Sequence, residues 1–287
     1  ENLVKPGKPD YQSATFGHKG QIYDGWETRR RREDGYDEAI VRLGAPGVIR
    51  TIIVDTAWFT GNYPPRISVE AASVDGFPSA QELYENAEWK TIVAVSPVQG
   101  DSENRFDVTS DERWTHVKLS IYPDGGVARL RVLGRGRPDP GFAAAGPFDL
   151  AALENGGYIS ACSNMFYSSP NNLLLPGPPR SMGEGWETSR RRSGSNDWVQ
   201  VTLAGTGTVR LAELDTTCFI GNAPGAASLK GRLDDGEWVE LLPRTRLQPD
   251  TRHRFLIDED EPVSEVRMDI FPDGGMARLR LFGNVTA

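Results

Sequence analysis

The sequence predicts an all-β protein made of two tandem, internally duplicated β-sandwich domains. The first observation is a repeat: Gly-Trp-Glu-Thr at 25–28 returns at 185–188, and Asp-Thr-x-x-Phe-x-Gly-Asn-x-Pro at 55–64 returns at 215–224. Both motifs shift by the same 160 residues, so they belong to one duplicated unit. The second is composition, since 31 glycines and 20 prolines among 287 residues indicate many turns and short strands.

A third repeated motif sets the domain boundaries. Pro-Asp-Gly-Gly at 123–126 returns at 272–275, a shift of only 149 residues, so the second copy is shorter between the motifs. We expect a first repeat at 1–134, a Gly- and Pro-rich linker at 135–147 and a second repeat at 148–287. Residues 2–9 match 172–179, and a further segment, 156–167, precedes that match in the second copy. We therefore expect the first repeat to be truncated at its N-terminus by an equivalent strand and loop.

Short β-branched and aromatic runs mark the expected strands. They are 39–43, 48–54, 66–70, 114–122 and 127–133 in the first copy, and 198–203, 209–214, 266–271 and 276–282 in the second. Because Pro-Asp-Gly-Gly is a strong turn sequence, residues 122–131 are expected to form a hairpin. Helix is sparse, with one short segment expected at 79–86 and Ser79 as its N-cap.

Composition excludes several classes of function. The net charge of −8 disfavours a nucleic-acid partner, and no apolar run approaches the length of a membrane span. Cys162 and Cys218 lack metal-ligand spacing, so reduced thiols in a cytoplasmic protein are expected. No cofactor motif is evident. The sequence leaves the oligomeric state open, including a homo-oligomer.

The Trp-Glu-Thr-x-Arg-Arg-Arg segment is the first candidate for chemistry. In an extended strand, Glu27, Arg29 and Arg31 would share one face, and Thr28, Arg30 and Arg32 the other. Guanidinium groups bind a carboxylate in a bidentate fork that lysine cannot form. The alternative interpretation is a solvated, salt-bridged edge strand.

Polar residues at a strand exit form the second candidate. Asp55 directly follows the expected strand at 48–54, and Asn62 lies seven residues further on. Such groups can converge on a cleft, or they can satisfy local backbone in an Asx-type turn. The three histidines lack metal-site spacing. His116 is a candidate for proton transfer, with a structural role as its alternative.

With three linked motifs present twice over nearly the whole chain, the sequence resembles the allantoicase (allantoate amidinohydrolase) family. The resemblance implies jelly-roll domains of galactose-binding-like type and hydrolysis of allantoate to ureidoglycolate and urea in purine degradation. It also agrees with a further strand and aromatic loop ahead of residues 2–9. A divalent metal held by Asp and Glu oxygens is a variant that the sequence leaves open.

Allantoate carries a carboxylate and two ureido groups, which suggests roles for the repeated polar residues. Proton transfer is assigned to acidic groups in both copies and to the histidine: Glu27, Asp55, Glu187, Asp215 and His116. Substrate binding is assigned to Thr28, Arg30, Arg32 and Asn62, and to Thr188, Arg190, Arg192 and Asn222. The alternative function is a non-catalytic tandem β-sandwich module that binds carbohydrate or a small anion.

Overall fold

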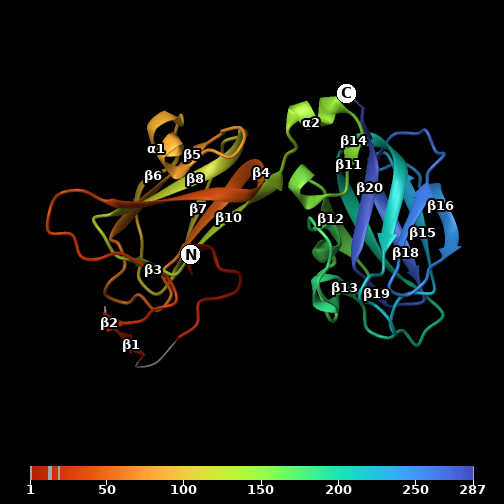
Figure 1. Ribbon diagram of the computed structural model, residues 1–287, viewed down its shortest axis with the longest axis horizontal. Helices are drawn as coiled ribbons and strands as arrows, with labels where there is room; N and C mark the ends of the chain where they lie inside the picture. The colour runs from red at the N-terminus through yellow and green to blue at the C-terminus, as the bar shows by residue number, and fades with distance from the viewer. Residues whose placement is uncertain (1, 12–14, 19, 287) are drawn as a thin grey trace. The chain divides into compact units, whose positions relative to one another are not determined.

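The computed structural model describes residues 2–11, 15–18 and 20–286. The chain forms two compact units, Glu1–Arg135 and Gly136–Ala287. Each unit is a β-sandwich, and strands far outnumber helices in both (Figure 1). The predicted all-β, internally duplicated fold is confirmed.

The first unit has one α-helix, one 3-10 helix and ten strands in its described part. They are η1 Asn2–Val4, β1 Phe16–Gly17, β2 Gly20–Gln21, β3 Trp26–Glu27, β4 Asp37–Asp55, β5 Arg66–Ala72, α1 Ala80–Asn86, β6 Lys90–Pro97, β7 Glu103–Asp107, β8 Arg113–Tyr122, β9 Gly126–Val127 and β10 Arg129–Gly136. The main sheet has the order β10-β4-β8-β5-β6, with β7 paired to β4.

A single long strand, β4, organises this unit. Its first half pairs with β8 and its second half with β7, so one strand serves both layers of the sandwich. The sequence predicted two strands here, at 39–43 and 48–54. They are one strand, with a register shift between Arg42 and Gly47, at the Gly-Ala-Pro-Gly sequence.

The predicted hairpin at 122–131 is wrong. Strands β8 and β10 are not neighbours, because β4 lies between them in the sheet. The Tyr122–Pro123 peptide is cis, Gly125 has φ +145°, and the next two residues form β9, which pairs with β3. The Pro-Asp-Gly-Gly turn therefore carries the chain to the Trp26–Glu27 segment.

The second unit repeats this arrangement. Its elements are α2 Pro140–Ala145, β11 Phe148–Asp149, η2 Leu153–Asn155, β12 Tyr158–Cys162, η3 Pro170–Leu174, η4 Met182–Glu184, β13 Trp186–Glu187, β14 Asp197–Asp215, β15 Ala226–Arg232, β16 Val239–Arg246, β17 Arg252–Leu256, β18 Val263–Phe271, β19 Gly275–Met276 and β20 Arg278–Val285. The order β20-β14-β18-β15-β16 matches that of the first unit, and β12 adds a strand to the first half of β14.

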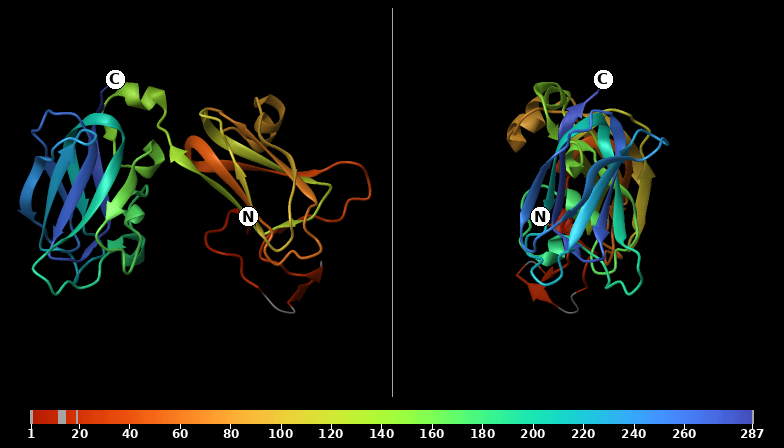
Figure 2. Two further views of the ribbon diagram at one scale, coloured as in Figure 1. Left: turned by 180° about the vertical axis from the view of Figure 1, so that it is seen from behind. Right: turned by 90° about the vertical axis from the view of Figure 1, so that its right-hand side faces the viewer.

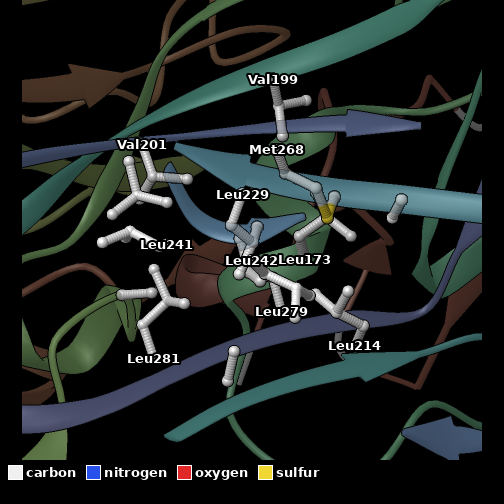
Figure 3. Packing of buried hydrophobic residues seen from close by; sticks show 14 of the residues in the cluster. Leu173, Val199, Val201, Leu214, Leu229, Leu241, Leu242, Met268, Leu279 and Leu281 are labelled. Atoms are coloured by element: carbon white, nitrogen blue, oxygen red, sulfur yellow. The ribbon is translucent and has the colours of Figure 1, made fainter. Parts of the chain in front are cut away.

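Each unit has a hydrophobic core of its own. In the second, alternate residues of β14, including Val199 and Val201, point inward to meet Met268, Leu279 and Leu281 (Figure 3). In the first, Ile52, Val54, Val117 and other β4 and β8 residues do the same. Because each repeat buries its own apolar face, each can be described as a separate folding unit.

Two local predictions concern helices. Ser79 is the N-cap of α1 and completes a capping box with Glu82, as expected. The segment predicted as a linker, 135–147, includes the end of β10 and the short helix α2.

Across the described ranges, no helix combines the length and apolar character needed to cross a membrane. Cys162 and Cys218 are both free thiols.

Candidate active site in each repeat

The short β3–β9 pairing brings two of the repeated motifs together. Trp26 pairs with Val127, and Glu27 pairs with Gly126. A Cβ atom at Gly126 would lie 2.0 Å from the ring of Phe59, so only glycine permits this approach. Phe59 belongs to the Asp-Thr-x-x-Phe-x-Gly-Asn-x-Pro motif at 55–64. All three motifs therefore meet at one place, and the second unit does the same through β13 and β19.

A glutamate–asparagine pair links the first motif to the second. The Asn62 side chain donates to Oε1 of Glu27 at 2.5 Å. In the second unit, Asn222 donates to Oε1 of Glu187 at 2.6 Å. This contact fixes Oε1 of each glutamate. The second carboxylate oxygen, Oε2, can then contact a ligand or exchange a proton with it. The sequence assigned all four residues to the site, and the structure joins them in pairs.

Thr28 and Thr188 hold the Pro-Asp-Gly-Gly turn. The amide of Gly125 donates to Oγ1 of Thr28 at 3.3 Å, and the amide of Thr28 donates to the Gly125 carbonyl at 3.0 Å. Thr188 makes the same two contacts with Gly274, at 3.1 Å each. The threonine hydroxyl is therefore engaged by the backbone, which makes it a scaffold for the site.

One arginine of each run is structural. The amide of Arg31 donates to Asp124 at 2.7 Å, and its guanidinium donates to Asp37 at 2.7 Å. Arg191 repeats these contacts with Asp273 and Asp197. The Arg31–Asp124 contact thus holds segment 28–32 against the Pro-Asp-Gly-Gly turn. Strand β3 ends at Glu27, and residues 28–32 have no regular strand structure. The predicted alternation of arginines between two faces of a strand is therefore wrong.

The Arg191–Asp197 pair is well anchored. Asp197 is fully buried, and it also accepts a hydrogen bond from Ser163 at 2.8 Å. Burial alone would raise the pKa of this carboxyl. The hydrogen bonds from Arg191 and Ser163 outweigh that effect and lower its pKa. Arg191 is therefore held by a charged partner, and its guanidinium is committed to the scaffold.

The neighbouring arginines are free to bind a ligand. Arg30 and Arg32 are exposed, and no ion-pair partner for either occurs among the residues that the structure describes. Arg190 and Arg192 are exposed in the same way. These are the four arginines that the sequence assigned to the substrate carboxylate.

A cavity of about 380 Å³ lies over these groups in the first unit. Glu27, Arg30 and Asn62 line it, together with Tyr63 and Asp124. It thus offers a carboxylate, an amide and an unpaired guanidinium within one hollow. These groups suit a small, polar, anionic ligand.

A larger cavity, of about 710 Å³, also lies along the arginine run. Trp26, Arg29, Arg32 and Asp37 are among its lining residues, and Arg30 lines both cavities. In the second unit, the loop after β12 covers the corresponding surface. There the Trp186 indole donates to the Asn164 carbonyl at 2.8 Å, and Ser163 bonds Asp197.

Asp55 is not among the residues that line the 380 Å³ cavity. Asp55 and Asp215, its equivalent in the second unit, each make a local backbone contact instead. Oδ1 of Asp55 accepts the amide of Ala57 at 2.8 Å, and Asp215 accepts the amide of Thr217 at the same distance. These are Asx-type turns, the alternative interpretation from sequence. Burial raises the pKa of Asp55, and nearby Glu103 adds to the effect.

His116 lies at the far end of strand β8. It is six residues from Tyr122, which adjoins the turn, so about 20 Å of strand separates it from the site. In Figures 1 and 2 this is the α1 end of the unit, opposite β3. The side chain is buried against Thr115, and burial lowers its pKa. The structure thus places His116 in a structural setting, away from Glu27.

The lining residues that the sequence did not assign to the site include Tyr63 and Asp124. Asp124 was interpreted as a turn residue, although its repetition as Asp273 was visible. Tyr63 is absent from the second copy, where Ala223 takes its place, so repetition could not reveal it.

Within the described ranges, no three His, Cys, Asp or Glu side chains are grouped to hold a metal ion.

Comparisons with known proteins agree with the repeated site. A family model described as the allantoicase repeat matches residues 1–137 and again 148–286. The chain belongs to the allantoicase family. It is 58% identical to a probable allantoicase of Nocardia farcinica, over 99% of this chain and 87% of that protein. The allantoicase of Dictyostelium discoideum is 42% identical, over 98% of this chain and 79% of that protein.

A solved structure of a family member has the same fold. The crystal structure of allantoicase from Saccharomyces cerevisiae aligns with a TM-score of 0.81 and 35% identity. The alignment covers 98% of this chain and 85% of that one.

Proposed function

We propose that this allantoicase-family protein hydrolyses allantoate to ureidoglycolate and urea, using the Glu–Asn pair and the adjacent free arginine of each repeat. The observation that carries the proposal is the 380 Å³ cavity, where Glu27, Asn62 and Arg30 meet. The repeated Glu187–Asn222 pair supports a second site of the same kind.

The substrate's groups fit these residues. Allantoate has a carboxylate on the carbon that bears two planar ureido groups. The Arg30 guanidinium can take the carboxylate in a bidentate fork, and Arg32, which lines the 710 Å³ cavity together with Arg30, adds positive charge. The amides and carbonyls of the ureido groups can pair with Glu27 and with the polar backbone of the turn.

The reaction breaks the bond between the central carbon and one ureido nitrogen. A hydroxyl from water takes that position, and the departing nitrogen takes a proton and leaves as urea. Glu27 can accept a proton from water or deliver one to the leaving nitrogen, because Asn62 holds one carboxylate oxygen and orients the other. Asn222 would orient Glu187 in the same way.

The cellular setting is also a proposal. The free thiols of Cys162 and Cys218 suit the reducing cytoplasm that the sequence predicts. A homo-oligomer stays a prediction that only a solution measurement of mass can test.

Urea release from allantoate by the purified protein tests the function, with and without a chelator. We expect urea release in both conditions, since the described Asp, Glu, His and Cys side chains supply no three-ligand group. Absence of urea above background would contradict the proposed function and favour the binding-module alternative. Activity lost with chelator and restored by a divalent cation would instead show a metal-assisted reaction.

A further inference from the structure

The two candidate sites differ at the residue that follows the asparagine. In the first repeat, Asn62 is followed by Tyr63, and this side chain lines the 380 Å³ cavity beside Glu27. In the second repeat, Asn222 is followed by Ala223. The glutamate, the asparagine and the free arginine are kept in both repeats. An aromatic ring at the position after the asparagine is present in only the first repeat.

A second residue changes together with this tyrosine. A Cβ atom at Gly100 would lie 2.4 Å from Cδ1 of Tyr63, so the ring occupies a slot that only glycine leaves open. The second repeat has Pro249 at the position of Gly100, at the same 149-residue spacing as the Pro-Asp-Gly-Gly motifs. The first repeat thus pairs tyrosine with glycine, and the second pairs alanine with proline.

The ring is well placed to act as a rigid surface. Tyr63 is half-buried and packs against the core of the first unit, and Gly100 lets the backbone approach its edge. A flat side chain held in this way loses little further freedom when a ligand binds. Its face can stack against another planar group.

We propose that Tyr63 determines the affinity of the first-repeat site by stacking against a planar ureido group of the substrate. This inference rests on the proposed function. The second-repeat site, with Ala223, lacks this ring and binds the same substrate more weakly. The two repeats therefore form a tighter and a weaker site, which differ in KM while sharing one set of reacting groups.

The test requires the first site to be measured alone. Glu187→Gln removes the proton-transfer group of the second site, and urea release by this protein then reports the first. In that background, Tyr63→Phe keeps the flat ring, whereas Tyr63→Leu keeps apolar packing without it. We expect Phe to hold KM within about twofold and Leu to raise KM by about tenfold, with kcat little changed.

The reciprocal change tests the same idea in the second site. Glu27→Gln isolates that site, and the paired substitution Ala223→Tyr with Pro249→Gly installs both the ring and its slot. We expect KM to fall toward that of the first site.

Three results separate the inference from the function on which it rests. If the unsubstituted protein releases no urea, the proposed function fails. If it is active but the Glu187→Gln protein is not, the first site does no chemistry and the inference is overturned. An unchanged KM for Tyr63→Leu in an active Glu187→Gln protein also overturns it and leaves the function intact.

Discussion

Adjacent arginines in this protein have different roles because their partners differ. Arg31 is bonded to Asp37 and Asp124, whereas Arg30 is exposed beside Glu27. The sequence shows identical side chains in a row and cannot reveal which one the fold engages. Asp124 is 93 residues from Arg31, so only the tertiary structure brings the two together.

Replacing the free arginines tests their role as the carboxylate anchor. We expect Arg30→Lys with Arg190→Lys to raise KM for allantoate by about tenfold or more, because an ammonium cannot form the bidentate fork. Steady-state urea release measures this. Arg50→Lys, in an exposed ion pair on β4, is the matched control. An unchanged KM in the double variant would show that Arg30 and Arg190 do not bind the substrate carboxylate.

A buried ion pair joins Asp24, which precedes the Gly-Trp-Glu-Thr motif, to Arg129 at the start of β10. Arg129 is 2% exposed, and it donates to Asp24 at 2.5 Å. This hydrogen bond, with a second from Lys5, holds the pKa of Asp24 well below its usual range. A folded-state pKa below the unfolded value gives stability that is complete above about pH 4 and is lost as the pH falls further.

Asp24→Asn should therefore destabilise the protein in a pH-dependent way. We expect a loss of about 2 kcal/mol in the free energy of unfolding at pH 7, since Arg129 would lose its charged hydrogen-bond acceptor. Urea denaturation at pH 7 and pH 3 measures the difference from the unsubstituted protein. An equal difference at both values would show that the carboxylate charge is not responsible.

At the scale of elements, the site depends on two very short strand pairs. β3 and β9 contribute two residues each, and their contact requires Gly126 against Phe59. The Pro-Asp-Gly-Gly sequence correctly predicted a turn at Pro123–Gly126. The prediction that this turn joins the two strands of a hairpin is wrong. Local sequence specifies that the chain turns there, but which strand it then meets depends on β4 lying between β8 and β10.

Gly126→Ala tests this close approach. The new methyl group would overlap the Phe59 ring, so we expect a loss of about 2 kcal/mol in unfolding free energy. Gly44→Ala is the control, because a Cβ atom there has open space around it, and its effect should stay within about 0.5 kcal/mol. Chemical denaturation of both proteins provides the comparison. Similar values for the two would mean that the ring moves aside freely.

At the scale of the whole molecule, duplication was the strongest sequence signal. Repetition indicated the two units and drew attention to Glu27 and Asn62, because those residues are kept in both copies. It also drew attention to Asp55 and Thr28, which are kept for turn and backbone contacts. Repetition alone cannot distinguish a residue kept for chemistry from one kept for folding, and it cannot detect Tyr63, which occurs in one copy only.

The most direct test is urea release by the Glu27→Gln/Glu187→Gln double variant at saturating allantoate. We expect each single variant to keep part of the activity and kcat of the double variant to fall by about a thousandfold, because a proton-transfer group is lost from both sites. Glu85→Gln/Glu240→Gln, which changes two exposed glutamates outside the described cavities, should retain full activity. A double variant that folds normally and releases urea at the unsubstituted rate would contradict the proposed role of Glu27 and Glu187 in proton transfer.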